Sequence, residues 1–167
     1  INKRQLLSAY SNLAISAEAI GKDLATSYYR DFMNLLKAYP ESASAAPEYE
    51  LYYTSANYYL GIKDYKKFIE FSDSLINFSK QIPLYKEHVI AYVSAKAAAY
   101  DSLRMYKEAY ETSKEYAVLL DTLRMQELRK KMENLEIEKG ANELVIEKKS
   151  LELELQKSKK ENYLYIS

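Results

Sequence analysis

Apolar side chains recur along this chain at intervals of three and four residues, in several separate stretches. One stretch covers residues 65–76, and similar stretches cover residues 24–39 and 106–120. This spacing places the apolar residues on one side of an α-helix, whereas a half-buried strand would alternate every second residue. The pattern therefore predicts amphipathic helices, each with one buried face. In the third stretch the predicted buried positions are Tyr106, Ala109, Tyr110, Ser113, Tyr116, Ala117 and Leu120.

Glycine and proline mark the ends of these helices. The 167 residues include 3 glycines and 3 prolines, too few for the frequent turns of a sheet protein. We expect Gly21 and Gly61 at turns inside helical hairpins, and Pro40, Pro47 and Pro83 between hairpins. The predicted helices cover residues 3–20, 23–39, 47–60, 64–80, 84–103 and 106 onward.

A sequence repeat relates two of the predicted hairpins. The segment ANYYLGIKDYKKFIE, residues 56–70, parallels AAAYDSLRMYKEAYE, residues 97–111. Tyr59 aligns with Tyr100, so the offset is 41 residues. Repetition of one supersecondary unit is typical of a helical solenoid, in which each hairpin buries its apolar face against the next.

The repeated residues resemble the motif of the tetratricopeptide repeat (TPR) family. That motif has a small residue in its first helix, then an aromatic residue, a turn, and a small residue in its second helix. The matching positions are Ala56, Tyr59, Asp64, Tyr65 and Phe68 in one copy and Ala97, Tyr100, Tyr106 and Ala109 in the other. Phe68 departs from the small residue of the motif, and the offset exceeds the usual repeat of about 34 residues. The resemblance implies an all-α fold, with a TPR-like solenoid of about three hairpins over residues 1–120 and a long coiled-coil-like helix over residues 121–167.

The register of the hairpins assigns several residues to the concave face, where some members of the TPR family bind peptides. The candidate partner-binding residues are Glu50, Tyr53, Asn57, Ser94 and Asp101. Some members hold a terminal carboxylate there with Lys and Asn. Asn57 stands where such an Asn would, but no cation accompanies it, so we expect no binding of a terminal carboxylate.

The last third of the chain predicts a long charged helix with apolar residues at coiled-coil intervals. The predicted seam consists of Met125, Leu128, Met132, Leu135, Leu144, Leu151 and Leu155. The register breaks between Leu135 and Ile137, beside Gly140, so the pattern allows a kink or a helix end there. Two interpretations remain open: a single helix that packs back on the repeats, and a parallel homodimer that conveys a signal.

The composition argues against nucleic-acid binding, metal sites and catalysis. Lys and Arg total 24 and Asp and Glu total 24, so no basic surplus is available for nucleic acid. The 18 tyrosines are interpreted as packing residues. There is no cysteine, and the one histidine, His88, is expected to be structural because a single histidine cannot supply the paired ligands of a di-metal helix bundle. We therefore expect a non-enzymatic protein without catalytic residues, cofactor or metal.

A repeat module followed by a Glu/Lys/Leu-rich coil also resembles one class of bacterial membrane-bound regulators, which have a histidine kinase or helix-turn-helix output domain. The resemblance covers residues 97–166, and residues 163–166 stand where that class enters the membrane. It implies that this chain is a fragment: a periplasmic sensor and protein-interaction segment of an inner-membrane protein, attached only through residues beyond Ser167. The alternatives are a cytoplasmic adaptor that binds a peptide in the concave groove, and a structural spacer.

Overall fold

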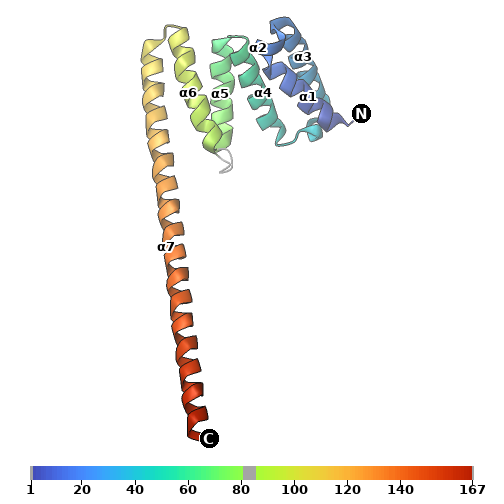
Figure 1. The fold of residues 1–167 in the computed structure, drawn as a ribbon. Coiled ribbons are helices and arrows are strands. Elements are labelled where there is room, and N and C mark those ends of the chain that lie inside the picture. The colour runs from blue at the N-terminus through green and yellow to red at the C-terminus, as the bar shows by residue number, and fades with distance from the viewer. Residues whose placement is uncertain (1, 81–85, 167) are drawn as a thin grey trace. The chain divides into compact units, whose positions relative to one another are not determined.

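The computed structural model describes the backbone of residues 2–80 and 86–166, and the side chains of residues 2–80 and 89–153. Over these residues the secondary structure is helical, without a strand (Figure 1). The elements are α1 (Lys3–Ile15), α2 (Ala17–Ile20), α3 (Lys22–Ala38), the 3₁₀-helix η1 (Pro40–Ser42), α4 (Pro47–Gly61), α5 (Tyr65–Lys80), α6 (Lys86–Ser102) and α7 (Tyr106–Ile166). The predicted all-α fold class is confirmed. Pro83 and the side chains of His88 and Leu155 lie outside the described residues.

The chain forms two compact units, Ile1–Leu120 and Asp121–Ser167. In the first unit the helices lie side by side, and each packs mainly on its neighbours in sequence (Figure 1). Phe68, Leu75 and Val93 are fully buried in the core that α4, α5 and α6 share. Phe32 fills a smaller core within the first hairpin. The second unit is the continuation of α7 as a helix.

The helix predicted over residues 3–20 is interrupted at Ser16, where α1 ends and α2 begins. The Ser16 hydroxyl donates to the Asn12 carbonyl at 2.7 Å. Its amide donates to the Leu13 carbonyl at 3.2 Å, three residues back instead of four. A serine hydroxyl that bonds the preceding turn competes with the regular hydrogen bonds of a helix. The prediction of one unbroken helix is therefore wrong at this position.

A long helix runs through Gly140, which lies inside α7. The break that the sequence pattern allowed there does not occur as a helix end. One glycine costs about 1 kcal/mol relative to alanine inside a helix, and the Glu, Lys and Leu residues on both sides favour the helix enough to continue it.

The first turns of α7 belong to the first unit and present to the core a different face from the predicted one. Tyr116 and Leu119 pack against the core of α4, α5 and α6, and Thr112 is buried on the same side of the helix. Tyr106 and Tyr110 are 65% and 67% exposed. The prediction of burial is wrong at four positions, which are Tyr106, Tyr110, Ser113 and Ala117.

Stacked tyrosines join the first hairpin to α4. The rings of Tyr29 and Tyr58 are stacked with centroids 4.1 Å apart. The Tyr29 hydroxyl shares a hydrogen bond of 2.8 Å with the Ser55 hydroxyl, and the Tyr58 hydroxyl shares one of 2.8 Å with Thr26. Each ring thus fills apolar space while its hydroxyl is paired. These contacts support the interpretation of the tyrosines as packing residues.

The two turns that the sequence repeat aligns have the same backbone geometry. Lys63 and Arg104 both have φ of 61°, in the left-handed region. The amide that follows each of them donates five residues back, to the carbonyls of Tyr59 and Tyr100, both at 2.9 Å. This is the Schellman ending of a helix. The two turns that the sequence repeat aligns therefore end their helices in the same way.

Gly61 has a different role from the one expected. The left-handed residue of its turn is Lys63, and Gly61 is the last residue of α4. A Cβ at Gly61 would lie 3.2 Å from the Cβ of Ala17, closer than such atoms normally approach. The glycine therefore permits close packing of α4 on α2, whereas Gly21, with φ of 87°, does occupy a turn.

Replacing the left-handed residues with glycine should stabilise the first unit. Lys63→Gly and Arg104→Gly should each raise the free energy of unfolding by about 1 kcal/mol, because glycine adopts positive φ without steric cost. Glu70→Gly, inside α5 and exposed, is the control and should lower it by about 1 kcal/mol. Urea denaturation measures all three, and a loss of stability on Lys63→Gly would contradict the assignment of that turn.

Candidate functional site

The predicted concave-face residues on α4 are used for contacts inside the protein. The Asn57 side-chain amide donates to the Tyr53 carbonyl at 2.8 Å and to the Tyr92 hydroxyl on α6. The Tyr53 ring stacks on Tyr49 with centroids 5.9 Å apart. Asn57 therefore joins α4 to α6, two helices that are not adjacent in the chain.

Glu50 also has an internal partner. Its carboxylate accepts a hydrogen bond of 3.2 Å from the Ser44 amide and a second one from the Ser44 hydroxyl. The carboxylate thus holds the loop that leads into α4. This contact occupies the acidic group that the sequence assigned to the groove.

The two remaining candidates lie on α6. Ser94 is half-buried and Asp101 is exposed, two helical turns apart. Among the interactions of the described residues, none connects either side chain to Tyr53 or Asn57. The structure therefore brings together Tyr53 and Asn57 but not the full predicted set. It adds Tyr92, which no sequence motif marked because a tyrosine in an apolar helix face looks like an ordinary packing residue.

Burial changes the acid–base behaviour of two tyrosines at these helix contacts. Desolvation raises the pKa of Tyr92 well above its ordinary value, and the hydrogen bond from Asn57 partly opposes this effect. Desolvation likewise raises the pKa of Tyr29, against the opposing hydrogen bond with Ser55. Both side chains stay neutral in the folded protein under ordinary conditions and act as hydrogen-bonding groups, not as bases.

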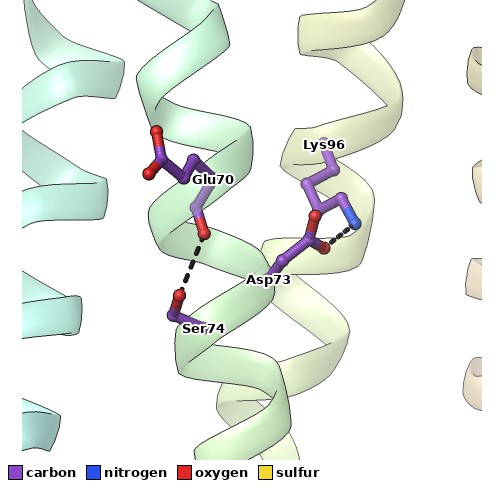
Figure 2. A network of polar contacts seen from close by, with 4 residues as sticks. All are labelled: Glu70, Asp73, Ser74 and Lys96. Atoms are coloured by element: carbon purple, nitrogen blue, oxygen red, sulfur yellow. Dashed lines mark hydrogen bonds and ion pairs between the residues drawn. The ribbon is translucent and has the colours of Figure 1, made fainter.

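An ion pair joins α5 to α6. Lys96 Nζ contacts the carboxylate of Asp73, as Figure 2 shows, and also lies 5.9 Å from the centre of the Tyr100 ring. The Lys96 side chain is 12% exposed, and the Asp73 side chain is 50% exposed. A lysine this buried requires a nearby carboxylate. We interpret the pair as a contact that fixes how α6 lies on α5.

The predicted seam of α7 does not lie on one side of the helix. Since α7 is unbroken and each residue advances about 100° around the axis, Leu144 lies about 180° from Leu135. Ile146 and Leu153 instead continue the side that carries Leu135. The first four seam residues, Met125, Leu128, Met132 and Leu135, are 53–61% exposed within the chain. All of these side chains are available to a partner.

A cleft of about 420 Å³ lies between α3 and α4. Leu36, Pro47 and Leu51 provide apolar lining, and Lys37 and Glu48 add charge. No motif predicts it, because its residues come from two helices.

Metal and membrane features are absent from the part of the chain that the structure describes. No three His, Cys, Asp or Glu side chains there are grouped to hold a metal ion. No helix among the described residues combines the length and the apolar character of a membrane span. Comparisons with protein-family models, curated proteins and solved structures find no match to this chain.

Alkaline pH should destabilise the first unit through Tyr92, which is buried, and Tyr29, which is half-buried. In the unfolded chain Tyr29 and Tyr92 ionise near pH 10, whereas in the folded protein they remain neutral to higher pH. The unfolded state then binds fewer protons, so the contribution of these groups is complete below about pH 10 and is lost above it, by up to about 1.4 kcal/mol per pH unit for each tyrosine.

Tyr92→Phe should reduce the loss of unfolding free energy above about pH 10. Urea denaturation at several pH values between about 9 and 11.5 measures this change. Tyr110→Phe is the control, since that side chain is 67% exposed. An equal pH dependence in the Tyr92→Phe variant and the parent would show that Tyr92 does not contribute.

Proposed function

We propose that this chain is a non-catalytic, TPR-like interaction and sensor module of a larger bacterial regulator that is attached to the membrane beyond Ser167. In this proposal residues 1–120 form the repeat domain, and α7 joins two copies in parallel and conveys a signal toward the output part. The periplasmic location belongs to the same proposal. The order of the elements, a row of helices followed by one long helix, supports the proposed combination of a helical domain with a signalling helix.

The observation that carries the proposal is the apolar side of α7. From Met125 to Leu135 four large apolar side chains recur at intervals of three and four residues, and Ile146 and Leu153 follow on the same side. More than half of the surface of each of these side chains is exposed. Exposure of so many large apolar groups on a charged helix is unfavourable, at about 25 cal/mol per Å². Pairing with a second α7 would bury them in the manner of a coiled coil.

The unbroken helix supports a second half of the proposed seam that differs from the one expected from the sequence. The side that carries Leu128 and Leu135 continues at multiples of seven residues from the first part of the seam, through Lys139, Asn142, Ile146, Lys149 and Leu153. A buried Asn specifies register and two-stranded pairing, since it can bond to its own copy in a parallel dimer. We therefore place the second half of the seam at Ile146 and Leu153, and Leu144 and Leu151 on the opposite side.

Two matched double variants test this seam. Ile146→Lys with Leu153→Lys should convert the dimer to monomer, because about 1.5–3 kcal/mol per buried side chain is lost and the dissociation constant rises more than about 100-fold. Leu144→Lys with Leu151→Lys adds the same charge on the opposite side and should leave the dimer intact. The two pairs are equally exposed in the single chain, at 67% and 58% in each pair. Sedimentation velocity over a range of concentrations distinguishes dimer from monomer for the parent chain and for both double variants.

Three results would contradict parts of the proposal. A parent chain that is monomeric at every concentration would exclude the dimer. Dissociation by the Leu144 and Leu151 variant alone would place the seam on the other side. For the membrane attachment, we expect about 20 consecutive apolar residues shortly after Ser167, and a chain that terminates without them would exclude it.

A further inference from the structure

The helices α3 and α4 are held together at one end and leave a cleft at the other. At the first end the Tyr29 ring stacks on Tyr58 with centroids 4.1 Å apart, and the two hydroxyls share hydrogen bonds with Ser55 and Thr26. Toward the connection at residues 39–46 lies the cleft of about 420 Å³, which we name the α3–α4 cleft. This volume is within the range of small-molecule sites, about 300–1,000 Å³.

The floor of the α3–α4 cleft is apolar. Leu36 is 7% exposed, and Met33 and Leu51 are half-buried beside it. These side chains are part of the core of the first hairpin, which includes Phe32. A ligand group that enters the cleft meets apolar side chains in place of water, so the floor favours an apolar group.

Polar groups of both charges stand at one end of this cleft. The helices run in opposite directions (Figure 1), so Lys37 in the last turn of α3 and Glu48 in the first turn of α4 both lie near residues 39–46. Asn34, one turn before Lys37, lies on the same side of α3. All three side chains are exposed, and no hydrogen bond or ion pair joins any of them to another described residue. The cleft thus offers an ammonium, a carboxylate and an amide beside an apolar floor.

We propose that the α3–α4 cleft binds a free α-amino acid with a large apolar side chain. The ligand carboxylate pairs with Lys37 and Asn34, its ammonium pairs with Glu48, and its side chain lies on the apolar floor. A ligand that carries both charges on its α-carbon satisfies both charges of the cleft at once. A purely anionic or cationic ligand would instead bring its charge close to a like charge.

This inference names a ligand for the proposed sensor, and it rests on the proposed function in that respect only. The cleft lies within the first unit, away from the α7 seam. Binding to the cleft can therefore be measured whether the chain is a dimer or a monomer.

Each cleft charge also complements the dipole of its own helix. A cation in the last turn and an anion in the first turn are favourable without any ligand. Removal of either charge would therefore lower the stability of the folded chain in any case. Stability does not test the site, whereas the dependence of binding on the chemistry of the ligand does.

Four small molecules test the site on the full chain. L-Leucine is the probe; 4-methylpentanoate lacks its amino group, 3-methylbutylamine lacks its carboxylate, and glycine lacks its side chain. Chemical-shift changes in NMR titrations measure weak binding of each. Leucine should bind saturably in the millimolar range, because exposed ion pairs are weak, and each of the other three should bind about five-fold more weakly or worse.

Charge variants test the assigned residues. Lys37→Glu and Glu48→Lys should each weaken leucine binding about five-fold, because one ligand charge then faces a like charge. The double variant exchanges the two charges and should restore most of the binding, since leucine can enter with its charged groups exchanged. Lys66→Glu with Glu70→Lys, an exposed pair on α5, is the control and should leave binding unchanged. Circular dichroism checks that each variant is folded.

The inference is overturned if leucine gives no saturable shift changes at tens of millimolar. It is also overturned if 4-methylpentanoate or 3-methylbutylamine binds as tightly as leucine, or if the double variant binds no better than the single ones. Any of these results leaves the proposed dimer untouched, and a monomeric parent chain would contradict the dimer without changing leucine binding.

Discussion

The enclosure of α4 is the constraint on which the rest of the first unit depends. Thr54, Ser55 and Ala56 are consecutive and each is 0% exposed, so neighbours cover more than half of the helix circumference at that level, about 200°. Such enclosure requires small side chains, because larger ones would hold the surrounding helices apart. α1, α3 and α5 all pack on α4, and Asn57 adds the link to α6. A change of volume at the centre of α4 would therefore affect both hairpins at once.

Hydroxyl groups make this enclosure specific. Thr54 pairs with Ser11 of α1 at 2.7 Å, and Ser55 pairs with Tyr29 of α3. An unpaired buried hydroxyl costs about 1–3 kcal/mol, so a shift of either helix along α4 would lose these bonds as well as apolar contact. The abundance of tyrosine follows from the same requirement: the ring fills the space between two helices and the hydroxyl fixes their alignment.

Features that depend on local sequence could be predicted, whereas features that depend on packing between helices distant in the chain could not. The helices between Lys22 and Ser102 and the turn at Gly21 follow from spacing and from breakers, which act within a few residues. The Asn57–Tyr92 contact joins residues 35 apart, and no periodicity specifies it. The exposure of Tyr106 and Tyr110 was mispredicted for a related reason. Spacing identifies an apolar side, but only the tertiary arrangement determines whether a neighbour covers it.

The two ends of the helix row expose different kinds of side chain. On α1 the exposed residues include Lys3, Arg4, Ser8 and Asn12, a polar side that is stable against water. On α7 the exposed side carries Tyr106 and Tyr110, which are 65% and 67% exposed. A row of helices needs a polar outer side at each end to stay soluble, and the two exposed tyrosines make the α7 end less polar than the α1 end.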